Sequence, residues 1–184
     1  TGGAPLDIKR VVDDLVRRGL PMPLLLRFSD VLGARVRELH GAFTDKMKEF
    51  GYRGRYQGVM PIKVNQQRHV VEELLAMGEE VGLGLEAGSK PELWLALAQM
   101  SHRDGGVVVC NGYKDRAYVE TALLGQQLGN DVLIIVDRFQ ELPLIIECSK
   151  RLGLEPKIGV RCKLSSKGSG RWAESGGDKS KFGL

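Results

Sequence analysis

Short apolar runs alternate with amphipathic stretches along most of this sequence. At intervals of 24 to 26 residues, the apolar runs begin near Gln57, Val81, Val107, Val132 and Ile158. Runs such as VVVC and VLIIV are apolar throughout, which is typical of parallel strands whose two faces are both buried. The stretches between them have helical spacing, and two of these helices are predicted to end at Gly129 and Gly153. The pattern therefore predicts five strands with four intervening helices.

The first 55 residues follow a different pattern. LDIKRVVDDLVRRG predicts a short amphipathic helix that ends at Gly19, and PMPLLLRF, residues 21–28, predicts a strand. A long helix is predicted next, with Ser29 as its N-cap. We therefore divide the chain into a lead-in, residues 1–55, and a repeating strand–helix region, residues 56–184.

The repeating region predicts an α/β fold with about five strand–helix units, preceded by a helix and a strand. One architecture with this rhythm is a TIM-type (β/α)8 barrel, which needs ~250 residues when complete, so this chain would hold only part of one. The alternative is an open, doubly wound sheet of five strands. Periodicity does not distinguish the two folds, and the residues at the strand ends favour the partial barrel.

Composition and charge narrow the classes of function. Hydrophobic residues make up 42% and charged residues 27%, as in a soluble globular protein, and no apolar run is long enough to cross a membrane. The net charge of +4 arises from mostly interspersed residues, so we expect no nucleic-acid partner. The three cysteines have no CxxC spacing, which disfavours zinc and suggests reduced thiols in the cytoplasm. The chain begins at Thr1 and stops at Leu184, and we expect it to be a piece of a longer protein.

A polar residue lies at or just after the end of each predicted strand: Lys63, Glu86, Asn111, Asp137 and Arg161. The carboxyl ends of parallel strands meet at one edge, so these side chains are expected to converge. Lys63 is the candidate nucleophile, because a desolvated amine can condense with an aldehyde; a surface lysine is the alternative. Glu86 and Asp137 are expected either to pair with cations or to cap the helices that follow. Arg161 keeps its charge and requires an anionic or carbonyl partner.

Two glycine-rich stretches are candidates for phosphate binding. Gly82, Gly84 and Gly88 form G-x-G-x-x-x-G, which is not the dinucleotide fingerprint, and the first two precede or lie within the strand instead of the turn after it. SSKGSG, residues 165–170, either cradles a phosphate through backbone N–H groups or forms a loop, and the polar residues after it favour the loop. The three histidines have no spacing that suggests a metal site.

The motifs at the strand ends resemble those of the biosynthetic arginine decarboxylases of bacteria and plants, pyridoxal-phosphate enzymes of the alanine-racemase-like fold group. The similarity extends from about Leu24 to the last residue and is carried by PIKVNQQRHVVEELLAMG, GLEAGSKPEL, VVCNGYKDRAYVETALLG, GVRCKLSSKGSGRW and SGGDKSKFGL. The resemblance implies a β/α barrel with the cofactor at its C-terminal mouth, followed by a β-rich domain. It implies that Lys63 bonds covalently to pyridoxal 5'-phosphate and that Glu86 and Arg161 lie around the cofactor. Lys181 matches the lysine of the family's KFG motif.

The resemblance also implies an activity. The family decarboxylates L-arginine to agmatine and carbon dioxide in polyamine and spermidine biosynthesis. The resemblance also implies a homo-oligomer and an involvement of magnesium. The sequence shows no clear set of carboxylates that would bind the magnesium ion. The family's phosphate cradle and proton donor would lie beyond Leu184, so we expect this chain alone not to decarboxylate arginine. A non-catalytic carrier of pyridoxal phosphate on the same type of barrel is the alternative.

Overall fold

Five parallel strands form one sheet in the computed structural model, which describes residues 5–101, 103, 106–163 and 183–184. In the order in which they lie in the sheet, the strands are β1 (Val59–Pro61), β2 (Gly84–Ala87), β3 (Val107–Cys110), β4 (Asp131–Val136) and β5 (Lys157–Val160). This is also their order in the sequence. A doubly wound sheet reverses its strand order, whereas a barrel wall keeps it. The structure therefore confirms the partial barrel and excludes the open alternative.

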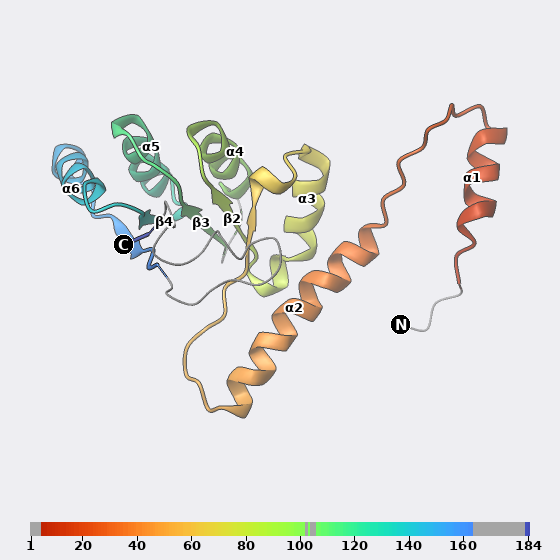
Figure 1. The fold of residues 1–184 in the computed structure, drawn as a ribbon, viewed down its shortest axis with the longest axis horizontal. Coiled ribbons are helices and arrows are strands. Elements are labelled where there is room, and N and C mark those ends of the chain that lie inside the picture. Colours follow the sequence, from red (N-terminus) through yellow and green to blue (C-terminus); the bar gives the residue numbers. More distant parts are fainter. Residues whose placement is uncertain (1–4, 102, 104–105, 164–182) are drawn as a thin grey trace.

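Four helices follow the first four strands and lie in a row on one face of the sheet (Figure 1). They are α3 (Arg68–Met77), α4 (Lys90–Met100), α5 (Arg116–Gln127) and α6 (Glu141–Leu152). Two short 3-10 turns, η1 (Ile62–Val64) and η2 (Glu79–Val81), precede and follow α3. As predicted, glycines with positive φ follow α5 and α6, at Gly129 and Gly153.

The core lies between the sheet and these helices. On β3 and β4 the helix-facing side chains are fully buried, and those on the other face are half-buried or exposed. The helix-facing set consists of Val108, Cys110, Val132, Ile134 and Val136. Both faces of β2 are buried, since all four of its residues are buried. The prediction that both faces are buried is wrong for β3 and β4, because helices cover only one face of the sheet in the part of the chain that the structure describes.

Tyr118 ties α5 to the end of β2. Its ring is buried, and its hydroxyl donates a hydrogen bond of 2.9 Å to the carbonyl oxygen of Ala87. Burial raises the pKa of this hydroxyl, so the donor stays protonated. Burial likewise raises the pKa of the neighbouring Cys110 thiol to about 12, although a hydrogen bond with Tyr118 acts in the opposite direction and lowers it. Cys110 is therefore a core residue and not a nucleophile at neutral pH.

Gly84 allows β2 to approach β3 closely. A β-carbon at this position would overlap the carbonyl oxygen of Val107 and lie 2.8 Å from its backbone nitrogen. Backbone atoms of a paired strand cannot move aside, so Gly84→Ala should lower the free energy of unfolding by about 1–3 kcal/mol in urea denaturation. Gly58→Ala is the matched control, because the nearest atoms to its new β-carbon are side-chain atoms at ordinary contact distance, Leu83 Cδ1 at 3.5 Å and the Tyr56 hydroxyl at 3.6 Å. Equal losses in the two variants would contradict this account.

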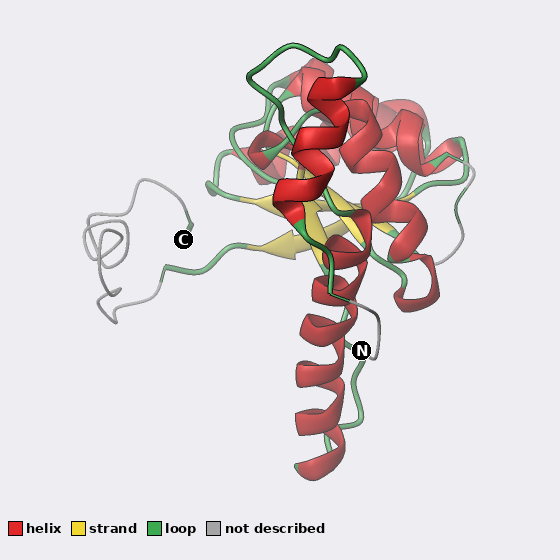
Figure 2. Cartoon of the chain, turned by 90° about the vertical axis from the view of Figure 1, so that its right-hand side faces the viewer, coloured by secondary structure: helices red, strands yellow, loops and turns green. Residues whose placement is uncertain are grey.

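The lead-in contains α1 (Ile8–Arg17) and α2 (Ser29–Glu49). α1 buries no residue and lies on the far side of α2 from the sheet (Figure 1). α2 packs against α3, where a β-carbon on Gly33 would lie 2.8 Å from Met77 Sδ, and one end of α2 extends well below the sheet (Figure 2). The prediction that Ser29 is the N-cap of α2 is wrong. Ser29 is the first residue of the helix, and its hydroxyl donates to Glu73 Oε2 at 2.8 Å. No helix in the described ranges is long and apolar enough to span a membrane.

The strand predicted over residues 21–28 is wrong. The segment forms no helix or strand, and none of the five strands pairs with it. Pro21 and Pro23 lack N–H groups, so apolar composition alone could not provide a ladder of hydrogen bonds. The segment docks through its polar residue instead: Arg27 Nη1 lies 2.9 Å from His69 Nε2, and Arg27 Nη2 donates to Gln67 Oε1.

Candidate functional site

Lys63 lies immediately beyond the carboxyl end of β1. The predicted strand stops earlier than expected, at Pro61, and Lys63 is the middle residue of η1. The preceding side chain, Ile62, is buried in the core and fixes the turn, whereas Lys63 itself is exposed. Within the described residues its amine forms no hydrogen bond or ion pair. Of the two alternatives for Lys63, the described part of the chain shows the exposed lysine and not the desolvated amine, and the amine is accessible for bonding.

Glu86 lies on the strand next to Lys63. It pairs in register with Pro61, two residues before the lysine, so both side chains belong to the same stretch of the sheet edge. The side chain is almost fully buried, with 7% of the residue exposed, and Oε2 has no hydrogen-bond partner in the structure as described. Within the described residues, Glu86 neither caps α4 nor forms an ion pair with a cation. A buried carboxylate oxygen without a partner is costly and indicates a site that a ligand completes.

Asp137 and Arg161 meet at the ends of β4 and β5. Asp137 directly follows β4 with its side chain fully buried, and Arg161 directly follows β5. Arg161 Nη1 lies 3.4 Å from Asp137 Oδ1. Asp137 does not cap α6, whose N-cap position is Gln140. Of the two alternatives for Asp137, the structure shows pairing with a cation and not capping, and Arg161 has the anionic partner that its charge requires.

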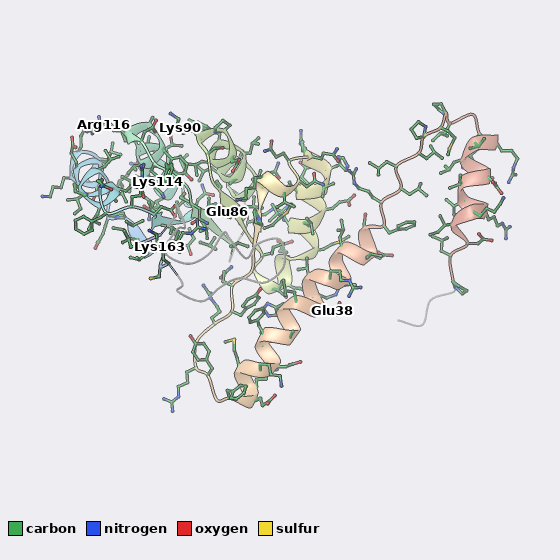
Figure 3. The ribbon with its side chains drawn as sticks, viewed as in Figure 1. Glu38, Glu86, Lys90, Lys114, Arg116 and Lys163 are labelled. Carbon is green, nitrogen blue, oxygen red and sulfur yellow. The ribbon has the colours of Figure 1, made fainter. Side chains whose placement is uncertain are left out.

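Two further charged residues belong to this cluster, although neither was predicted from the sequence. Lys114 follows β3 and Glu141 begins α6, and both are buried (Lys114 and Glu86 are labelled in Figure 3). Lys114 Nζ lies 3.5 Å from Asp137 Oδ2 and 3.5 Å from Glu141 Oε2. The sequence did contain one indication that Lys114 belongs to the site. Lys114 lies in CNGYKD, within a motif that carries the resemblance and between a strand and a helix.

Gly183 and Leu184 hold the backbone around Arg161. The Gly183 N–H donates to the Asp137 carbonyl at 3.2 Å, the Leu184 N–H donates to the Arg161 carbonyl at 2.8 Å, and the Lys163 N–H donates to the Leu184 carbonyl at 2.9 Å. Gly183 has φ of +90°, and a β-carbon there would lie 3.0 Å from the Arg161 carbonyl oxygen, so only glycine fits without strain.

The other predicted features lie elsewhere. Lys181 and the stretch SSKGSG fall outside the described residues. Asn111, half-buried after β3, donates its backbone N–H to the Ala87 carbonyl at 2.8 Å.

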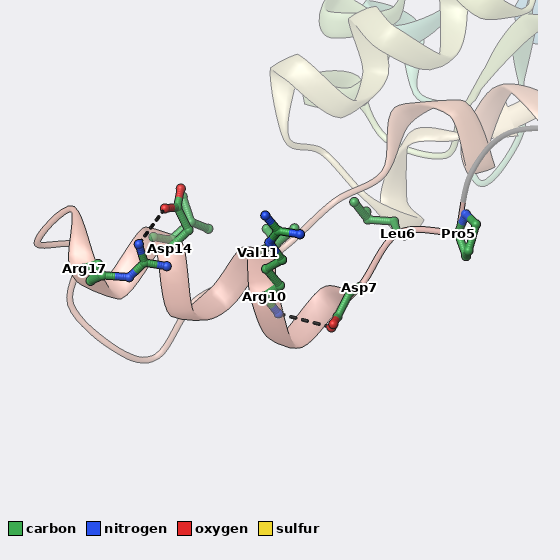
Figure 4. Close-up of a pocket in the computed structure, with 8 residues that line it drawn as sticks. Pro5, Leu6, Asp7, Arg10, Val11, Asp14 and Arg17 are labelled. Carbon is green, nitrogen blue, oxygen red and sulfur yellow. Dashed lines mark hydrogen bonds and ion pairs between the residues drawn. The ribbon is translucent and has the colours of Figure 1, made fainter.

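A surface hollow lies along α1, lined among others by Asp7, Arg10 and Asp14 (Figure 4). Asp7 there accepts a hydrogen bond from the Arg10 backbone as the N-cap, so its role in this hollow is structural.

Comparison with known proteins decides the family. Residues 34–184 match the family model described as "Pyridoxal-dependent decarboxylase, pyridoxal binding domain". The chain belongs to this family of pyridoxal-dependent decarboxylases. At the ends of its strands it carries an accessible amine, a buried carboxylate with one unpaired oxygen and a guanidinium, and this set fits a pyridoxal group chemically.

Individual relatives add detail to the family assignment. The chain is 51% identical to the biosynthetic arginine decarboxylase of Gloeobacter violaceus over 183 residues, which is 100% of this chain and 28% of that relative. The crystal structure of the biosynthetic arginine decarboxylase from Campylobacter jejuni matches with a TM-score of 0.82 and 34% identity, over 96% of this chain and 28% of that chain. The diaminopimelate decarboxylase of M. jannaschi, at 22% identity and a TM-score of 0.59 over 83% of this chain and 34% of that chain, shows the shared fold. The chain thus spans about 28% of the length of these curated relatives.

Proposed function

We propose that this chain supplies the lysine-bearing part of a pyridoxal-phosphate-dependent arginine decarboxylase, which converts L-arginine to agmatine and carbon dioxide. The observation that carries the proposal is the position of Lys63 beside Glu86 at the carboxyl ends of β1 and β2, in a member of the pyridoxal-dependent decarboxylases. The relatives that are about half identical over the whole chain are named biosynthetic arginine decarboxylases, which supports arginine as the substrate.

Each of the three site residues has a role in this proposal. Pyridoxal phosphate, when bound, supplies an aldehyde and a ring that takes up the electrons left when a carboxylate departs as carbon dioxide. Lys63 holds the cofactor through Nζ, which requires the neutral amine. Glu86 accepts a hydrogen bond from a donor in the completed site through its unpaired Oε2. Arg161 presents guanidinium donors whose direction is fixed by Asp137.

Borohydride trapping tests the proposal. The whole protein that contains this sequence is loaded with pyridoxal phosphate, reduced, digested and analysed by mass spectrometry. We expect the pyridoxyl mass on the peptide that carries Lys63, together with release of carbon dioxide from labelled arginine by the unreduced protein. A label on another lysine, with Lys63 unmodified, would refute the site. Cofactor on Lys63 without release of carbon dioxide from arginine would refute the activity and identify a non-catalytic carrier.

Further parts of the proposal rest on the resemblance alone. They are a place in polyamine biosynthesis, a cytoplasmic location and a homo-oligomeric state. Magnesium belongs to the same group of proposals, and this part of the structure gives it no ligands: the described residues contain no cluster of three or more histidine, cysteine, aspartate or glutamate side chains that could hold a metal.

A further inference from the structure

We propose that Lys114 and Glu141 are positioning residues for Arg161, that they act through Asp137, and that they thereby set the affinity of the site for pyridoxal phosphate. The inference rests on the proposed function, because it assumes that Arg161 faces the cofactor. Neither Lys114 nor Glu141 is expected to touch the cofactor itself.

The four residues form a continuous series of charges across the ends of β3, β4 and β5. Asp137 stands between two cations: Arg161 Nη1 lies 3.4 Å from its Oδ1, and Lys114 Nζ lies 3.5 Å from its Oδ2. Lys114 Nζ lies a further 3.5 Å from Glu141 Oε2. The side chains of Lys114 and Asp137 are 0% exposed and that of Glu141 is 3% exposed, whereas 44% of the Arg161 side chain is exposed. Arg161 is thus the end of a buried series that reaches the surface of the site.

Backbone contacts fix the buried members of this series. Glu141 accepts hydrogen bonds from the backbone N–H of Lys114 at 3.1 Å and from that of Asp137 at 2.9 Å, so one carboxylate joins the ends of β3 and β4. Lys114 Nζ also donates to the Gly112 carbonyl at 2.6 Å. These contacts hold the Lys114 amine and the Glu141 carboxylate in place on either side of the Asp137 backbone.

Charge balance explains why Lys114 matters to Arg161. The cluster contains two carboxylates and two cations, and a buried charge requires a partner. Because Lys114 balances part of the negative charge from the buried side, Arg161 contacts one oxygen of Asp137 while 44% of its side chain stays exposed. Without Lys114, both carboxylates would attract the Arg161 guanidinium inward and away from the cofactor. Lys114 therefore determines where the Arg161 guanidinium lies relative to the site.

Cofactor titration in two backgrounds tests this coupling. We compare the Kd for pyridoxal phosphate of the whole protein with that of Lys114→Met, Arg161→Gln and the double variant, under conditions where circular dichroism shows each to be folded. Lys114→Met should raise the Kd about tenfold in the natural background and by less than about twofold in the Arg161→Gln background. Lys157→Met is the matched control, because it removes an exposed pair with Asp131, of 2.6 Å, at the opposite ends of β4 and β5. It should leave the Kd unchanged.

The possible outcomes separate this inference from the proposed function. An unchanged Kd for folded Lys114→Met, or the same change in both backgrounds, would overturn the positioning role while the wild-type protein still binds the cofactor. Absence of cofactor on Lys63 in the wild-type protein would refute the proposed function and this inference with it. Glu141→Gln, which keeps a hydrogen-bond acceptor, is the second variant and should weaken binding only when Arg161 is present. Failure of both variants to fold would assign the cluster a purely structural role and reject the proposal.

Discussion

Lys63→Ala should lower the rate of arginine decarboxylation by the whole protein by ~10³-fold or more, because the covalent route through the cofactor is lost. The same change should barely alter stability. Lys63 is exposed, and its amine contacts none of the described side chains by hydrogen bond or ion pair, so the free energy of unfolding should change by less than about 0.5 kcal/mol. A steady-state assay of carbon dioxide release and a urea unfolding curve measure the two quantities on the same sample.

Lys90→Ala provides the control for this result. Lys90 also follows a strand at this edge of the sheet, but it is engaged in an exposed ion pair of 2.6 Å with Asp115. Loss of such a pair should cost no more than about 1 kcal/mol and leave turnover within a few-fold of the wild-type value. A Lys63→Ala protein that retains full turnover, or a Lys90→Ala protein as inactive as Lys63→Ala, would exclude Lys63 as the cofactor lysine.

Asp137→Asn should lower the free energy of unfolding by about 3–5 kcal/mol, because it removes one charge from a buried cluster and leaves the others without compensation. The Asp137 side chain is fully buried between Lys114 and Arg161, so water cannot replace the lost carboxylate. Asp131→Asn changes the same residue type on the same segment, at the other end of β4, where the partner Lys157 is exposed. That variant should lose no more than about 1 kcal/mol. Similar unfolding midpoints for the two variants would show that the cluster contributes no more than a surface pair.

The repeating part of the fold could be predicted from the sequence because strand burial and helix amphipathicity repeat at a fixed interval. Periodicity alone could not choose between a barrel and an open sheet, since that depends on which strands are neighbours. The residues at the strand ends favoured the barrel, and the strand order confirmed it. The false strand at residues 21–28 has a related cause: a strand needs a partner as well as apolar side chains.

The site was predictable to the extent that it depends on strand ends. Asp137 and Arg161 each follow a strand directly, and parallel pairing brings them together. Lys114 and Glu141 were missed because burial of a charge is decided by the packing of α5 and α6 over the strand ends, which no local pattern records. The position of Lys63 just after the first strand was predictable, but the choice between a desolvated and an exposed amine was not, because solvation of an amine depends on what surrounds it in space.

The contacts made by Arg27 bear on where this domain can be cut. The family model begins at residue 34, yet Arg27 reaches Gln67 and His69 in the segment just after the lysine turn, and Ser29 bonds to α3. A fragment that begins at residue 34 would lose all of these contacts at once. The unit that holds Lys63 in place therefore starts upstream of residue 34, where the family model begins, and a minimal version of it has to retain residue 27.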